Sequence, residues 1–464
     1  MNLHPLQNLV HEHKNGMRKG ICSVCSANEY VIEAAVSRAA DAGTFVLIEA
    51  TANQVDQFGG YTGMKPVHFR HFVHGIADRL HFPLERVILG GDHLGPLTWK
   101  SEPAEKAMRK AEELVRQYAA AGFTKIHLDT SMHLGDDPQD SPPDVHVVAE
   151  RAARLCRVAE SAARLCQAAE SAARLCQAEE SASMQVVHNT NDAASGTLSS
   201  PSIVYVVGSE VPVPGGSHEE EKGGIRVTRP EDFETTVDVF RKVFADRGLQ
   251  SAWERVIAVV VQPGVEFGDE TVHPYDRLEA ADLCSALKRH PQLAFEGHST
   301  DYQTASCLRQ MVEDGILILK VGPQLTFALR EALFALNLME MALFSGNDQA
   351  EPSCFMKTLE EAMLRNPGNW EKHYHGGEAK KKFARKYSFS DRCRYYLPDP
   401  AVQASMKRLM SNLQQGSIPL SLISQFMPIQ YGKIRNGLLA NDPEALLKDS
   451  VVSVQDAYYA ACGL

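Results

Sequence analysis

Three short stretches of the sequence carry side chains that could bind a metal ion and move a proton. VILGGDHLGP (87–96) contains Asp92 and His93, VQPGVEFGD (261–269) contains Glu266, and EGHST (296–300) contains His298. Imidazole nitrogens and a carboxylate oxygen suit a divalent metal ion, with zinc the first candidate and manganese the second. Asp92 would then act as the general acid or base. An isolated Asp-His pair is more often a loop capping motif, and the pair alone leaves that alternative open.

Other polar residues follow similar apolar runs and are predicted to contact a sugar or sugar-phosphate ligand. They are Glu49, Asp129, Gln262, Gly297, Ser299, Thr300, Asp301 and Lys320, and Glu210 is a second candidate catalytic residue. The backbone N–H groups and hydroxyls of EGHST suit the oxygens of a phosphate or a sugar. Lys320 would either contact this ligand or form an ordinary ion pair with Glu296 or Asp314.

The elements that must position these residues are eight apolar, β-rich runs separated by helix-like stretches. The runs are 20–25, 44–51, 86–93, 125–131, 202–210, 255–264, 293–301 and 316–323. This alternation predicts an α/β protein with a (β/α)8 TIM barrel, in which residues at the strand ends converge at one mouth. A doubly wound open sheet is the structural alternative, which the lack of a GxGxxG turn after the first run disfavours.

The predicted barrel spans residues 1–330, with a duplicated helical insertion at about 151–180, and a helical C-terminal extension (331–464) packs on it. The insertion reads RAARLCRVAE, SAARLCQAAE, SAARLCQAEE. Ten residues advance a helix by about 1000°, so successive copies are rotated by about 80° and share no apolar stripe. We interpret it as a tandem duplication that lengthens a helix, part of which projects or is irregular. A coiled-coil arm is the less supported alternative.

Two further segments allow two interpretations each. RKYSFSDRCRYYL (385–397) is either an ordinary helix start with solvated arginines or a patch whose Arg392 and Arg394 face an anionic ligand. The loop 211–224 is either a lid over the mouth or an ordinary exposed loop.

The composition is that of an ordinary globular protein, with 44% hydrophobic and 23% charged residues among 464. The net charge of −11 argues against nucleic acid or an anionic membrane as the main partner. The N-terminal stretch lacks a signal-peptide core, and no apolar run approaches the ~20 residues of a membrane span. The ten cysteines lack the spacing of a disulfide framework, so we expect reduced thiols in a cytoplasmic protein.

The chain resembles the accessory, non-catalytic subunits of tagatose-1,6-bisphosphate aldolase, which are class II aldolase-like barrels. The resemblance is carried by SANEYVIEAAV, LIEATANQVDQFGGYTGM, VILGGDHLGP, YVVGSEVPVPGG, VQPGVEFGDETV, EGHSTDYQT, KVGPQLTFALREALF and YSFSDRCRYY. It implies a zinc site with Asp92 as acid or base, His93 as first ligand and His298 as third. The place of the second histidine falls in VQPGVEFGD, where Glu266 is the nearest ligand type. A second departure is Gly322 and Pro323, where catalytic relatives have an asparagine-containing turn.

The resemblance implies a subunit that supports a smaller class II aldolase partner in galactitol, tagatose or amino-sugar catabolism, within an oligomer. The alternative is a metal-dependent ketose or keturonate 4-epimerase, or an aldolase (a lyase), that acts alone and uses Asp92. The four groups at 92, 93, 266 and 298 favour this alternative, and the altered turn favours the accessory role. Relatives are also labelled tagatose-6-phosphate kinase, but this sequence contains no P-loop or sugar-kinase nucleotide motif.

Overall fold

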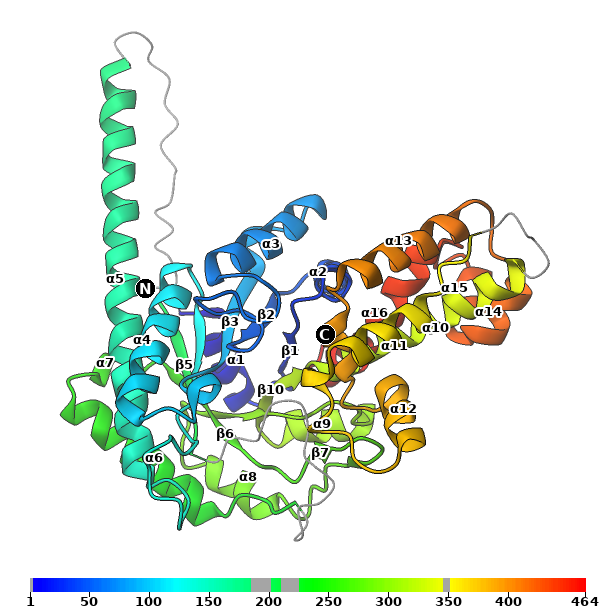
Figure 1. Ribbon diagram of the computed structural model, residues 1–464. Coiled ribbons are helices and arrows are strands. Elements are labelled where there is room, and N and C mark those ends of the chain that lie inside the picture. The colour runs from blue at the N-terminus through cyan, green and yellow to red at the C-terminus, as the bar shows by residue number, and fades with distance from the viewer. Residues whose placement is uncertain (1–2, 185–201, 210–224, 345–350) are drawn as a thin grey trace.

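Eight parallel strands close into a barrel whose order around the wall is β1-β2-β3-β4-β5-β6-β9-β10 (Figure 1). The computed structural model describes residues 3–184, 202–209, 225–344 and 351–464. The strands are β1 (Ile21–Cys25), β2 (Val46–Thr51), β3 (Val87–Leu94), β4 (Lys125–Leu128), β5 (Val204–Val207), β6 (Val256–Val261), β9 (Ala294–Gly297) and β10 (Ile316–Val321). The predicted (β/α)8 TIM barrel is confirmed.

The strands are apolar along nearly their whole length because both of their faces are buried. All six residues of β6, VIAVVV, are buried, as are the six of β10. One face fills the barrel interior and the other packs on the surrounding helices, so the polar–apolar alternation of a half-exposed strand is absent. The parallel register pairs Val46 of β2 with Val87 of β3 and ends by pairing Thr51 with Asp92, which brings Asp92 to the mouth.

Helices connect the strands and cover the barrel. They are α1 (Pro5–Lys14), α2 (Glu29–Ala42), α3 (Pro66–Arg79), α4 (Ala104–Ala120), α5 (Val145–Met184), α6 (Pro230–Asp246), α7 (Gln250–Trp253), α8 (Ala281–Leu287), α9 (Ala305–Glu313) and α10 (Pro323–Phe344). Two 3-10 helices, η1 (Leu84–Arg86) and η2 (Leu97–Trp99), flank β3, and a hairpin of β7 (Glu266–Phe267) and β8 (Val272–His273) follows β6. In α4, buried Ala107, Ala111, Leu114 and Tyr118 recur at the three- and four-residue spacing of a helix face.

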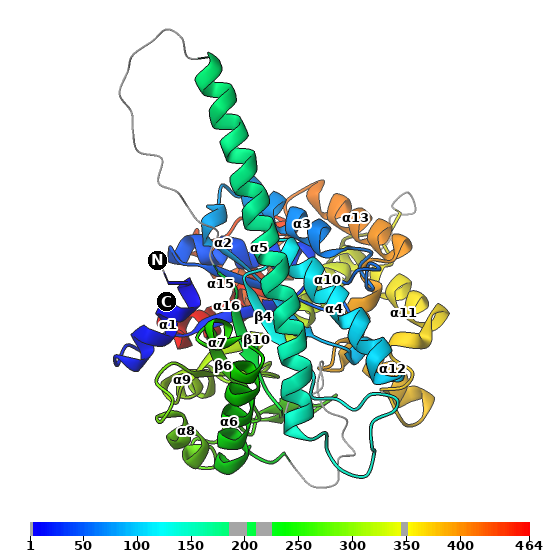
Figure 2. The same cartoon turned by 90° about the vertical axis from the view of Figure 1, so that its left-hand side faces the viewer.

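Helix α5 runs through the repeated decapeptides, and its distal part projects away from the barrel (Figures 1 and 2). Its buried side chains extend from Val148 to Ala162, and among those described beyond that point Leu165 is 72% exposed. The helix therefore packs on the barrel through its first half.

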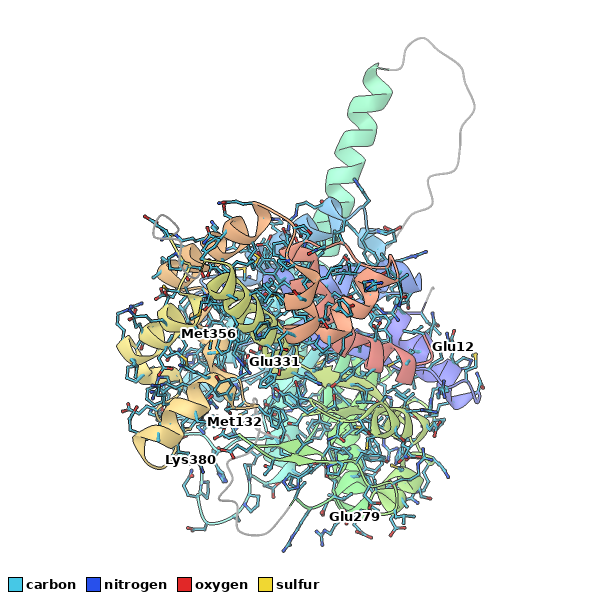
Figure 3. The ribbon with its side chains drawn as sticks, turned by 90° about the vertical axis from the view of Figure 1, so that its right-hand side faces the viewer. Glu12, Met132, Glu279, Glu331, Met356 and Lys380 are labelled. Atoms are coloured by element: carbon cyan, nitrogen blue, oxygen red, sulfur yellow. The ribbon has the colours of Figure 1, made fainter. Side chains whose placement is uncertain are left out.

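The C-terminal region consists of α11 (Phe355–Arg365), α12 (Glu378–Tyr387), α13 (Pro400–Gln414), α14 (Leu420–Phe426), α15 (Pro428–Arg435), α16 (Pro443–Ala461) and the 3-10 helices η3 (Pro367–Asn369) and η4 (Arg392–Tyr396). Figure 3 shows the molecule from this side, with Met356 on α11 and Lys380 on α12. Helix α16 contacts α2, α9 and α10 of the barrel. Because α10 runs continuously through the predicted boundary at 330/331, the division into two parts remains a prediction.

None of the helices in the described residues combines the length and the apolar character that crossing a membrane requires. The nine cysteines whose side chains the structure describes are free thiols.

Candidate metal centre at the barrel mouth

Four ligand-type side chains meet at the end of the barrel where the strands terminate. Asp92 and His93 lie near the end of β3, His127 lies near the end of β4, and His298 follows β9. One potential ligand atom from each lies within 4.8 Å of those of the others, and all four residues are buried. The imidazole centroids of His93 and His298 are 4.7 Å apart. The His127 centroid lies 5.0 Å and 5.2 Å from these two. Three imidazoles and a carboxylate form a donor set that suits zinc.

The local backbone at β3 explains the glycines beside Asp92 and His93. A Cβ on Gly90 would lie 2.6 Å from Cγ of Glu49, and one on Gly95 would lie 1.6 Å from the carbonyl oxygen of Asp129. Only glycine permits these approaches. His93 has a φ of 49°, a left-handed conformation. It costs a residue with a side chain about 1–3 kcal/mol and persists where surrounding contacts impose it, which is typical of functional sites.

Hydrogen bonds fix the orientation of the three imidazoles. Nδ1 of His93 lies 2.9 Å from Oδ2 of Asp129, and Nε2 of His298 lies 2.9 Å from Oε1 of Glu296. A carboxylate behind a histidine sets its tautomer and strengthens it as a metal ligand. Nδ1 of His127 lies 3.4 Å from Oδ1 of Asp92, and with its proton on Nδ1 the neutral ring leaves Nε2 unprotonated. Nε2 of His127 is buried and has no hydrogen-bond partner among the described residues. A buried nitrogen left in this state suits a position beside a metal ion.

His127 and His298 have the protonation state that a metal ligand requires. Burial lowers the pKa of His298 to about 3 and also lowers the pKa of His127, so both rings are neutral at pH 7. Neutral imidazole is the form that binds a metal ion. Burial opposes the ionisation of Asp129, but the hydrogen bonds from His93 and Ser131, together with electrostatic attraction to His93 and His127, outweigh it and lower the pKa of Asp129 to about 2.

A buried network of charges lies next to these ligand groups. Nζ of Lys125 is 2.7 Å from Oε1 of Glu49 and 2.5 Å from Oε2 of Glu296. Lys320 donates to Asp92, and its Nζ lies 3.4 Å from Oε1 of Glu296. Burial opposes the ionisation of Asp92, but Lys320 and the nearby imidazoles hold its pKa well below the usual range. Asp92 is therefore a carboxylate at neutral pH.

The site opens into a cavity of about 400 Å³ at the barrel mouth. The predicted residues that line it are Asp92, His93, His298, Ser299, Asp301 and Lys320. The C-terminal region adds Arg394 and Tyr395 from η4 and Gln403 and Met406 from α13 to the lining of this cavity. The barrel and the C-terminal helices therefore share this cavity.

The other predicted contact residues support the cavity from behind. Glu49 belongs to the buried charge network and Asp129 stands behind His93, as described above. Gly297 is the last residue of β9. The Thr300 hydroxyl donates to the carbonyl oxygen of Lys320 over 2.7 Å, and Oε1 of Gln262 accepts from the backbone N–H groups of Gly264 and Val265. Glu210 lies outside the described residues.

The structure brings His127 into the ligand group and places Glu266 elsewhere. Glu266 begins the β7–β8 hairpin after β6 has ended at Val261, and its Oε1 accepts the backbone N–H of Phe267 over 3.0 Å. Among the described residues, it is not one of the groups that meet within 4.8 Å. His127 was not predicted from the sequence, because a histidine inside an apolar run resembles an ordinary core residue. The alternation Lys125, His127, Asp129 was the available signal, since alternate residues of a strand share one face.

A sequence model of the D-tagatose-1,6-bisphosphate aldolase subunit GatZ/KbaZ-like family matches residues 6–171 and 164–463. The two matches overlap inside the repeat of 151–180. The crystal structure of a probable tagatose 6 phosphate kinase from Sinorhizobium meliloti 1021 is 43% identical, covers 96% of this chain and 100% of that chain, and has a TM-score of 0.81.

Two aldolase structures show lower similarity. The YdjI aldolase from Escherichia coli K12 is 10% identical, with 89% of this chain and 100% of that chain covered and a TM-score of 0.39. The fructose-bisphosphate aldolase from Campylobacter jejuni is 12% identical, with 89% and 94% covered and a TM-score of 0.42.

Proposed function

Because the chain belongs to the D-tagatose-1,6-bisphosphate aldolase subunit GatZ/KbaZ-like family, we propose that it is an aldolase subunit with a metal site of its own. The observation that most supports this proposal is the meeting of Asp92, His93, His127 and His298 within 4.8 Å. Burying ionisable groups costs stability, and Nε2 of His127 has no hydrogen-bond partner among the described residues, so a purely supporting subunit would have no need of this group. We propose zinc as the metal, with manganese second, and a smaller class II aldolase as the partner in tagatose or amino-sugar breakdown.

The side chains of the site divide between holding the metal and moving the proton. His93, His127 and His298 would hold the ion, which would supply Lewis-acid polarisation of the carbonyl of a keto sugar. Asp92 would accept the proton of the sugar hydroxyl next to the carbon–carbon bond that breaks, and would return it in the reverse direction. Lys320, which donates to Asp92, would stabilise the carboxylate.

The test combines metal analysis with an activity assay. Purified chain loaded with zinc is incubated with tagatose 1,6-bisphosphate, with and without a small class II aldolase. We expect bound zinc and a loss of turnover of about 100-fold or more in Asp92→Asn, the usual contribution of an acid–base group. Asp246→Asn is the matched control, because Asp246 is an exposed residue of α6 that pairs with Lys242. Turnover that requires the partner and is unchanged by Asp92→Asn would contradict the catalytic role and leave the supporting one.

A second candidate function is a ketose or keturonate 4-epimerase that acts alone. The completeness of the four-residue group within one chain favours it. The same preparation, without a partner, would be incubated with fructose, tagatose and tagaturonate. Epimerisation that is lost in Asp92→Asn would support this function, and no conversion of any of the three would contradict it.

A further inference from the structure

One arginine in the cavity forms no ion pair with any carboxylate of the described residues. Arg394 lies on η4 and lines the same cavity as the metal-site residues. Its Nη1 donates to the backbone carbonyl oxygens of Ser390 and Asp391, and its Nη2 donates to the hydroxyl of Tyr395 over 3.0 Å. These acceptors are all neutral. Within the described ranges, Arg394 makes no ion pair with a carboxylate.

Arg330 and Arg385 are paired with carboxylates, and the carboxylates near Arg394 already have partners. Arg392 is not paired with a carboxylate among the described residues, but it donates through Nη1 to the carbonyl oxygen of Asn369 and does not line the cavity. Nε of Arg330 lies 3.0 Å from Oδ1 of Asp391, and Nη2 of Arg385 lies 2.8 Å from Oε1 of Glu360. Oδ1 of Asp301 accepts the backbone N–H groups of Gly322 and Gln324 over 3.0 Å and 2.8 Å. Asp391 and Asp301 attract Arg394 electrostatically, but neither forms an ion pair with it. A bound anion would give the half-buried guanidinium the direct anionic partner that it lacks among the described residues.

The guanidinium keeps two donors available for such an anion. Arginine has five N–H donors, and the bonds to protein use two on Nη1 and one on Nη2. The Nε–H and the second Nη2–H of Arg394 therefore have no acceptor in the described part of the chain. Nε and Nη2 share one edge of the guanidinium, which suits two oxygens of a phosphate or a carboxylate.

The segment that carries Arg394 is held in place before any ligand binds. Asp391 has a φ of 45°, and its carboxylate is fixed by Arg330 and by the Thr326 hydroxyl over 2.6 Å. Cζ of Arg394 lies 4.5 Å from the centroid of the Tyr395 ring, and this ring packs edge-on against Tyr61 at 4.9 Å. A side chain that is already ordered loses little conformational entropy on binding.

We propose that Arg394 binds the anionic group of the sugar, a phosphate or a carboxylate, while the keto end of the sugar lies at Asp92. That the ligand is a sugar rests on the proposed function. That Arg394 binds an anionic group of this sugar rests on the contacts of Arg394. The cavity of about 400 Å³ lies within the range of small-ligand sites. The barrel would thus provide the reacting groups, and the C-terminal region would provide the selectivity for charged sugars.

The experiment measures binding, so that it does not depend on catalysis. Isothermal titration with tagatose 6-phosphate, tagaturonate, neutral tagatose and inorganic phosphate is performed on the zinc-loaded full chain and on Arg394→Gln. We expect the wild type to bind at least one anionic sugar about tenfold or more tightly than tagatose, and the variant to lose this preference. The stronger of the two anionic sugars identifies phosphate or carboxylate as the group that Arg394 binds. Arg394→Lys keeps the charge and loses the two-donor edge, and should show an intermediate preference.

The control is Arg435→Gln, an exposed arginine of α15 that donates to Tyr431. Equal affinity of the wild type for tagatose and both anionic sugars, or an unchanged preference in Arg394→Gln, would overturn the proposal. If Arg394→Gln fails to fold, the test uses two other measurements, the anion preference of Arg394→Lys and competition by inorganic phosphate on the wild type. The proposal is overturned if Arg394→Lys keeps the full preference and inorganic phosphate does not compete. Failure of the proposed function appears separately, as zinc that does not bind while the anion preference persists.

Discussion

His127 and Glu266 differ in how the barrel presents their side chains. His127 is a strand residue on the same face of β4 as Lys125, so the barrel wall directs it inward. Glu266 starts a hairpin after β6, and its carboxylate accepts a neighbouring backbone N–H. At the scale of single residues, therefore, whether a side chain joins the ligand group depends more on its position within a strand than on its chemical type.

Substituting His127 and Glu266 one at a time tests which of the two binds the metal ion. We expect His127→Ala to weaken zinc binding roughly 100-fold or more, because loss of even an outer-shell partner costs 10–100-fold. Glu266→Ala should retain the affinity of the wild type. Zinc titration with a competing chelator measures both. The reverse result, with retention in His127→Ala and loss in Glu266→Ala, would restore the ligand set expected from the sequence.

The sequence allowed Asp92, His93 and His298 to be selected because each stands at the end of an apolar run. It did not allow the selection of His127, since a histidine inside a strand resembles an ordinary core residue. The role of Arg394 depends on carboxylates that are committed elsewhere, such as Asp391 to Arg330, and pairing of this kind exists only in three dimensions.

Next to helix α1, one residue makes the stability of the protein depend on pH. His4 precedes the helix, and its Nδ1 accepts the backbone N–H of Leu6 over 3.2 Å. Its Nε2 lies 3.2 Å from the Thr124 hydroxyl, just before β4. Burial lowers the pKa of His4 to about 4. The folded protein therefore binds this proton less readily than the unfolded chain does.

The sign of the effect on stability follows from this difference. The contribution of His4 is fully present above pH 6.5 and is lost as the pH falls towards 4, by up to about 3 kcal/mol. His4→Asn retains an acceptor for the helix N-terminus and cannot titrate in this range. We expect the unfolding midpoints of wild type and His4→Asn to change relative to each other between pH 7 and pH 4, with the wild type losing more. Parallel curves would contradict this expectation.

At the scale of elements, the eight barrel strands were predictable because burial on both faces leaves uninterrupted apolar runs. Their ends were less predictable: the run 202–210 contains a strand of only Val204–Val207. The β7–β8 hairpin was not predicted, since two strands of two residues each give no periodic signal. Glu266 lies in this hairpin, and among the described residues it is not one of the groups that meet within 4.8 Å.

The molecule as a whole consists of a compact body and a projecting half of α5 (Figure 2). The last buried side chain described on this helix is Ala162. Deleting residues 163–180 removes about five complete turns and therefore preserves the phase of the helix. We expect the deletion to keep zinc binding and to change the Tm by less than about 2 °C, as measured by calorimetry. A Tm lowered by 5 °C or more would show that the projecting half stabilises the body.

Thr300, two residues after His298, is held in place by a hydrogen bond from a residue that is distant in the sequence. The hydroxyl of Tyr458 on α16 donates to the Thr300 carbonyl oxygen over 2.8 Å, across a separation of 158 residues. During synthesis at ~5–20 residues per second, this loop would leave the ribosome roughly 10 to 30 seconds before its brace is made. A nascent chain can thus form its barrel while the loop after His298 still lacks its final support, and binding of the proposed metal ion would then be one of the last events in the maturation of the protein.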